Sequence, residues 1–294
     1  MSLLKTRKDL LKVNLRVSPY MFKLSFLLVL FLFTQWSVAQ VSPVYMDPFH
    51  VILTQSEEIS DAMDLIRYGD FDGAVAILKK AKKSTERSYE VYYLLGIAYK
   101  LKGDIGEAIA NFTSATHEDA FFIPAFFERA SCYLIREQFR QAVFDYDRVI
   151  LIDTNFIPAY NNRAYARIRN YGEQSKPVYQ LKFAREDLLK AMQIAQSRGE
   201  DRRFETYFNL ALIDLFQSEY AKAAASLDTA ISSNSSSSKA YYFRGAARFL
   251  NRDYELAETD FLKAESLGFK HPNTPEFLKI IELVEAHKRK IKDE

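Results

Sequence analysis

Cysteine, histidine, glycine and proline are scarce in this 294-residue chain, and each scarcity excludes a class of protein. The one cysteine, Cys132, can build neither a disulfide framework nor a cysteine metal site. The four histidines form no pair with each other or with cysteine at metal-ligand spacing, so we predict no metal. Nine glycines and eight prolines are too few for a collagen-like or disordered chain. A composition of 48% hydrophobic and 27% charged residues instead predicts a sizeable core.

Catalytic and nucleic-acid-binding signatures are also missing from the sequence. It holds no glycine-rich phosphate loop, no nucleophile elbow and no HExxH motif. The formal net charge is +2, but six of the 40 basic residues and one of the 38 acidic residues precede residue 40. The remaining 34 basic and 37 acidic residues give a net charge of −3, which is not the basic footprint of a nucleic-acid binder. We therefore predict no enzyme, no cofactor and no nucleic-acid partner.

Long hydrophobic runs are absent except for Leu24–Phe33, which follows Lys23. Behind this run, Ser37-Val38-Ala39 places small residues at the −3 and −1 positions of a cleavage site, as in a secretory signal peptide. We predict a signal peptide over residues 1–39, cleavage after Ala39, and a periplasmic or envelope-associated protein of bacterial style. A run of ten is short for a membrane span of about 20 residues. An uncleaved anchor is the alternative, and it is the only membrane contact that we expect; Met21 is an alternative start.

The chain repeats itself with a period of 34 residues. The clearest match aligns Phe122–Ala130 with Phe156–Ala164. Extending this register predicts a linker over 40–54 and six blocks over 55–88, 89–122, 123–156, 157–203, 204–237 and 238–273. The fourth block is longer than the others, and we predict a loop over 170–177 and a long second helix there. That insertion is either a recognition loop or a tolerated addition.

Three positions of each block carry small residues that would let helices approach closely; they are the eighth, the twentieth and the twenty-seventh when the extra residues of the fourth block are left out of the count. In the second block these are Gly96, Ala108 and Ala115, with the aromatic Tyr92 before the first of them and Phe112 between the second and the third. This block, from Tyr92-x-x-Leu95-Gly96 onward, resembles the tetratricopeptide repeat, with Tyr92 in place of its leading Trp. The resemblance implies an all-α, right-handed superhelix of about six helix-turn-helix units. We expect residues 274–294 to form a C-terminal capping helix.

Arginine and aspartate occur together in three blocks. Where the seventh position is arginine, the matching position of the second helix is aspartate, and where it is leucine the aspartate is replaced by asparagine or serine. A bidentate ion pair between the two helices would require this pattern. The predicted structural pairs are Arg129 with Asp145, Arg163 with Asp187, and Arg244 with Asp260.

The family resemblance also implies a concave groove that binds extended peptides along the first helices. Carried onto this chain, mainly at the fifth and ninth positions, it gives Tyr93, Ile97, Phe127, Asn161, Asn162, Tyr165, Phe208, Leu212 and Tyr242. Two alternatives stay open, an open groove or a stripe that is covered by the superhelix itself or by Thr274–Lys290. The function predicted is an exported scaffold that binds a protein or peptide partner. The alternatives are a small-ligand or glycan-binding module that uses the groove aromatics, and a non-catalytic subunit of an envelope enzyme complex.

Overall fold

The computed structural model describes residue 52 and residues 56–81, 88–174, 179–200 and 203–269. The predicted signal peptide and the predicted capping helix lie outside these residues. The described part holds twelve α-helices and no strand, so the all-α prediction is confirmed. The helices are α2 (Glu57–Tyr68), α3 (Phe71–Ala81), α4 (Ser88–Lys102), α5 (Ile105–Glu118), α6 (Ile123–Ile135), α7 (Phe139–Ile152), α8 (Ile157–Gln174), α9 (Tyr179–Ser197), α10 (Arg203–Phe216), α11 (Tyr220–Ser233), α12 (Ser238–Leu250) and α13 (Tyr254–Ser266).

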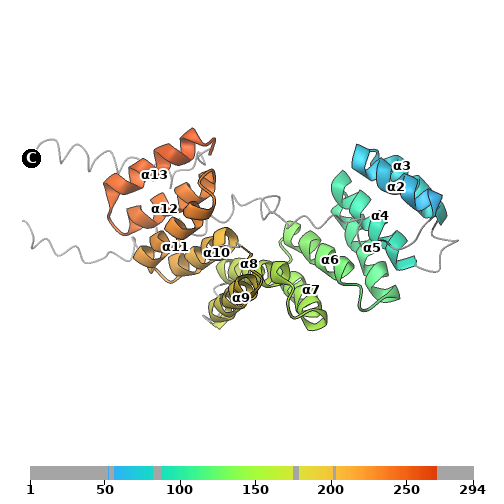
Figure 1. Cartoon of the computed structure of the whole chain (residues 1–294), viewed down its shortest axis with the longest axis horizontal. Coiled ribbons are helices and arrows are strands. Elements are labelled where there is room, and N and C mark those ends of the chain that lie inside the picture. The colour runs from blue at the N-terminus through green and yellow to red at the C-terminus, as the bar shows by residue number, and fades with distance from the viewer. Residues whose placement is uncertain (1–51, 53–55, 82–87, 175–178, 201–202, 270–294) are drawn as a thin grey trace, which may run out of the picture.

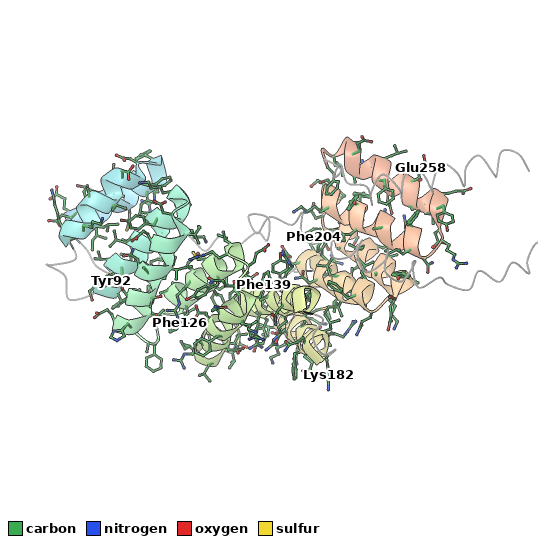
Figure 2. All side chains as sticks on the ribbon, turned by 180° about the vertical axis from the view of Figure 1, so that it is seen from behind. Tyr92, Phe126, Phe139, Lys182, Phe204 and Glu258 are labelled. Atoms are coloured by element: carbon green, nitrogen blue, oxygen red, sulfur yellow. The ribbon has the colours of Figure 1, made fainter. Side chains whose placement is uncertain are left out.

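The helices form six pairs that follow one another along an arc (Figure 1). Each helix packs against the helices before and after it in the chain, and α2 with α4, α4 with α6, and α8 with α10 make further contacts. Figure 2 shows side chains filling the spaces between successive helices, with Phe126 marking the third pair and Phe204 the fifth. The core therefore extends along the arc, as in other repeat proteins, where each unit is stabilised by its neighbours.

The turn inside most pairs depends on one residue with a left-handed backbone. Gly69 and Gly103 hold φ angles of 85° and 95°, which glycine adopts without a steric cost. In the third, fifth and sixth pairs the same place is taken by Glu137, Ser218 and Arg252, with φ angles of 56°, 60° and 71°. A residue with a Cβ atom is strained in this region, so these three turns cost stability that the two glycine turns do not.

The small residues of the repeat lie where the two helices of a pair cross. A Cβ atom on Gly96 would lie 2.5 Å from the Phe112 ring, and one on Gly245 would lie 2.8 Å from the Phe261 ring. The alanines at the eighth, twentieth and twenty-seventh positions of the blocks are buried. Close approach between the helices thus explains why the sequence keeps these positions small.

The fourth pair absorbs its extra residues mainly in its helices. The helix α8 continues to Gln174, so the predicted loop over 170–177 is wrong for residues 170–174. The helix α9 runs on to Ser197, which confirms the expected extension of the second helix past Ala191. The residues before Gln174 propagate the helix because no proline interrupts them until Pro177.

Candidate functional site

The predicted groove stripe is buried. All nine of its side chains, from Tyr93 in α4 to Tyr242 in α12, are 9% exposed or less. Residues in the stripe share a helix face as expected, but that face packs against neighbouring helices. For these residues the structure agrees with the alternative in which the superhelix covers the stripe, and it does not support the open groove.

The first two aromatics of the stripe pack in the same manner. The Tyr93 ring lies 5.9 Å from the ring of Phe112 and 5.4 Å from that of Phe122. The Phe127 ring lies 5.7 Å from Tyr146 and 5.3 Å from Phe156 in edge-on contacts. Each fifth-position ring is therefore held between the second helix of its own pair and the residue that precedes the next first helix. Such edge and tilted contacts are the favoured geometry of aromatic cores.

The last two aromatics are covered in a similar way. Phe208 contacts Phe243 at 5.4 Å between ring centroids. The Tyr242 ring stacks on Phe269 at 4.3 Å and lies 5.5 Å from Phe261. A sugar or flat apolar compound needs an exposed ring face to stack on. The small-ligand alternative therefore loses the rings on which it depended.

Polar side chains from α4, α6, α7 and α8 meet in one cluster, which we call the α4–α8 polar cluster. Lys100 Nζ donates to Glu128 Oε2 at 2.5 Å, and both side chains are partly exposed. Ser131 and Asn162 lie beside the Tyr146 hydroxyl, and burial raises the pKa of that hydroxyl. The cluster therefore has a partly exposed charged edge, formed by Lys100 and Glu128, and a buried neutral side. Such an edge can pair with the polar groups of a bound chain.

Asn161 occupies the fifth position, where four other blocks carry an aromatic residue. Its side-chain Oδ1 atom is buried and accepts no hydrogen bond within the described part of the chain. A buried carbonyl without a donor costs free energy, on the order of 1–3 kcal/mol. The fourth pair therefore departs from its neighbours at this position as well as in its helix lengths.

The three predicted Arg–Asp pairs come together in the structure with two hydrogen bonds each. In the third pair, Arg129 donates from Nε and Nη2 to the two oxygens of Asp145 at 2.8 and 2.7 Å. Its Nη1 atom donates to Thr113 and Thr116 of the preceding pair. Burial raises the pKa of Asp145, and Arg129 opposes that effect. The arginine thus joins two helices of its own unit and also contacts the unit before it.

The other two pairs belong to larger clusters that the sequence reasoning missed. Asp187 accepts from Arg163 and also from Arg167, and Arg163 donates to Asp147 of the preceding pair at 2.6 Å. The same four-residue arrangement recurs in the last pair, formed by Arg244, Arg248, Asp260 and Asp228. A signal was available, because a second arginine follows the first by four residues in only these two blocks. These clusters join consecutive repeat units.

Cys132 and Tyr165 are both buried, and burial raises the pKa of each to about 12. The Cys132 thiol therefore stays protonated at neutral pH, which leaves it a poor nucleophile.

Within the described residues there is no group of three acidic, histidine or cysteine side chains that could hold a metal ion. A search of the same residues for a helix both long and apolar enough to cross a membrane finds none.

Family models and solved structures are similar to this chain. Residues 89–118 and 208–268 match models of the tetratricopeptide repeat, and no curated protein matches the chain. A tetratricopeptide repeat protein from Parabacteroides merdae is 19% identical, with a TM-score of 0.54 over 78% of this chain and 98% of its own. The pilF structure from Pseudomonas aeruginosa is 13% identical, with a TM-score of 0.59 over 76% and 95%. The MamA structure from Desulfovibrio magneticus is 18% identical, with a TM-score of 0.51 over 61% and 96%.

Proposed function

Since the chain folds as a tetratricopeptide-repeat solenoid, we propose that it is an exported scaffold that binds a protein or peptide partner along the inner side of its arc. The observation that carries the proposal is the extended stack of six helix pairs, which presents a long continuous surface (Figure 1). Repeat stacks of this kind commonly use such surfaces for binding. The proposal rests on the fold and on the signal-like segment, because a fold alone does not define a function.

The contacts offered to a partner differ from the buried aromatics of the sequence prediction. Lys100 and Glu128, the charged edge of the α4–α8 polar cluster, are the polar groups there that water and a partner can reach. A bound chain could exchange the hydrogen bond between them for hydrogen bonds to its own backbone or charged side chains. The buried rings of Tyr93 and Phe127 then support the surface from beneath and hold its shape.

The binding proposal is tested by capturing partners on the tagged full-length protein from envelope fractions. The test variant exchanges the two charges, Lys100→Glu together with Glu128→Lys, so that the ion pair inside the protein is retained. We expect the exchange to weaken capture of a specific partner by roughly a hundredfold or more, since a misplaced charge at a contact costs several kcal/mol and each step of about 1.4 kcal/mol is tenfold in affinity. The matched control is Lys182→Glu on the exposed face of α9. Equal capture by wild type and exchanged variant would contradict the proposed contact.

Export is tested separately, by the mass of the mature protein. Expression of the full chain with a C-terminal tag should yield a protein that begins at Gln40 in the envelope or periplasmic fraction. This expectation follows from the apolar run and the small residues at the cleavage site. A tagged protein that retains its first 39 residues and stays in the cytoplasm would refute export and leave the binding proposal standing.

A further inference from the structure

The second helix of the third pair, α7, exposes two large apolar side chains more fully than the second helices of the other pairs do, and the loop before this pair adds a third. Phe121, Phe144 and Leu151 are 74%, 63% and 70% exposed. Phe144 and Leu151 lie seven residues apart on α7, so they share one helix face two turns apart. Figure 1 shows α7 on the outer side of the arc, with α6 nearer the inner side. A single exposed apolar residue is common on a protein surface, so these three are informative only if they lie together on one surface.

The other blocks show that folding does not require large apolar residues at these positions of the second helix. Where α7 has Phe144, they carry small or polar exposed residues: Ala76, Ala110, Glu186, Ala225 and Thr259. Where α7 has Leu151, they carry polar exposed residues: His117, Gln193, Ser232 and Ser266. The fold therefore forms equally well with small or polar side chains there.

Phe121 is unusual in the same way. It lies in the loop between α5 and α6, where its backbone N–H donates to the Asp119 carboxylate at 2.8 Å. The loop before α8 has the same turn, with Asn155 donating to Asp153, and so does the loop before α12, with Ser236 donating to Asn234. The turn geometry is shared by all three loops, and only the first places an aromatic ring at this position. The turn therefore forms without an aromatic residue at this position, and the Phe121 ring is not needed for it.

Arg148 connects the three apolar residues. It lies on α7 between Phe144 and Leu151, and its Nη2 atom donates to the Ala120 carbonyl oxygen at 3.5 Å, next to Phe121. Its guanidinium also lies 5.7 Å from the centre of the Phe126 ring. In the described part of the chain no carboxylate pairs with Arg148. The surface therefore combines three apolar side chains with one cation that has no acidic partner among the described residues.

We propose that Phe121, Phe144, Arg148 and Leu151 form an outer docking surface for an amphipathic α-helix of a partner protein. The separation of Phe144 and Leu151, about 10 Å at 1.5 Å per residue, matches the i to i+7 spacing of an apolar stripe on such a helix. A carboxylate within that stripe would pair with Arg148 and desolvate it together with its apolar neighbours. This site lies away from the inner surface and goes beyond the function proposed above.

A protein helix fits this surface better than a membrane does. Glu118 and Asp119 precede Phe121 in its loop, and Asp147 lies on α7 between Phe144 and Leu151. A membrane would bring many anionic headgroups against all of these carboxylates at once, whereas a partner helix needs to bring only one carboxylate, placed at Arg148. Asp147 already pairs with Arg163 at 2.6 Å, so a docked helix would not leave it without a partner.

The proposal is tested by photo-crosslinking on the full-length chain in its own cells. A photoreactive phenylalanine replaces Phe144 or Leu151, and the matched controls carry it at Ala110 or Ala225, which are exposed at the position equivalent to Phe144. We expect crosslinks from 144 and 151 but not from the controls. Mass spectrometry of the crosslinked peptide should identify a helical segment of another protein, with an apolar stripe that includes Asp or Glu.

Substitutions with residue types that other blocks carry at the equivalent positions test the contribution of each side chain of the surface. Phe121→Asn with Leu151→Ser introduces residue types found at the equivalent positions of other blocks, so folding is preserved. These changes should reduce crosslinking at 144 by roughly tenfold, the loss expected when anchor residues of an interface are truncated. Arg148→Glu should reduce it as well, and reversing the partner's acidic residue to lysine should restore it. Crosslinks to lipid or to a second copy of the chain, equal crosslinking at the controls, or no crosslink at all would each overturn the proposal.

Discussion

Removing Arg129 alone should destabilise the solenoid strongly, because it would leave a buried carboxylate without its cation. Asp145 is 1% exposed, and both of its oxygens are held by Arg129, which is itself 12% exposed. Breaking a buried pair in this way typically costs about 3–5 kcal/mol. Arg129→Leu should therefore lower the free energy of unfolding by about that amount. Urea unfolding followed by circular dichroism measures the change as a shift in midpoint.

Two further variants separate loss of the cation from loss of packing. Arg129→Leu with Asp145→Asn recreates the combination of Leu95 and Asn111 in the second pair, so it should recover most of the stability. Arg163→Leu should cost less than Arg129→Leu, about 1.5–3 kcal/mol, because Arg167 still donates to Asp187. Equal midpoints for Arg129→Leu and its double variant would show that packing, and not an unpaired charge, sets the cost.

The destabilisation by Arg129→Leu should also depend on pH. Burial raises the pKa of Asp145 in the folded protein, and removing Arg129 takes away the main opposing effect. A carboxyl group whose folded pKa lies above its unfolded pKa costs stability when it is ionised; this cost begins to shrink as the pH falls through the folded pKa and is gone below the unfolded pKa. The gap between wild type and Arg129→Leu should therefore narrow as the pH is lowered from neutral toward the ordinary pKa of an aspartic acid, about 4. A gap that stays constant or widens on acidification would refute the unpaired-carboxylate explanation.

Three more predictions concern the turns, the crossings and the thiol. Ser218→Gly and Arg252→Gly should each raise the free energy of unfolding by about 0.5–1 kcal/mol, because both positions have positive φ angles. Thermal midpoints check this, and Gly103→Ala, at φ 95°, is the control that should move the midpoint down. Gly96→Ala should cost about 1–3 kcal/mol, because its Cβ would lie 2.5 Å from the Phe112 ring, whereas Gly106→Ala meets nothing within 4 Å and should cost none. The Cys132 thiol, with a pKa raised to about 12 by burial, should resist iodoacetamide at pH 8 in the native protein and react in urea. Rapid alkylation of the native protein would show that the third pair opens.

The sequence predicted the repeat fold because its regularity is set by a few strict local requirements. The small residues at the crossings and the turn residues mark where helices approach and reverse, and both follow directly from sterics. The same reasoning could locate Glu137, Ser218 and Arg252 as turn residues by alignment with Gly69 and Gly103. Ion pairing was also predictable, because the identities of two positions change together across the blocks.

The groove could not be predicted in the same way, because a helical period shows which residues share a face and not how close the next helix lies. Tyr93 and Phe127 share the expected stripe, but Phe122 and Phe156, at the ends of the loops that lead to the next pair, cover them. The clusters around Asp187 and Asp260 were missed for a related reason. The second arginines, Arg167 and Arg248, are visible within their blocks, but the carboxylates Asp147 and Asp228 come from the preceding unit, so a comparison within single blocks does not include them.

The positions that hold the solenoid together are separate from those that set its outer surface, and the third pair shows this most clearly. It keeps the framework of its neighbours, with Ala130 and Ala142 at the crossing and the Arg129–Asp145 pair between its helices. Its exposed Phe144 and Leu151 add nothing to that framework, because other pairs fold with alanine, threonine, serine or histidine in their places. Exposed apolar residues also favour aggregation, which gives a solenoid that needs only stability a reason to avoid them. Binding explains their presence on α7, and the crosslinking experiment tests that explanation without altering any residue on which the fold depends.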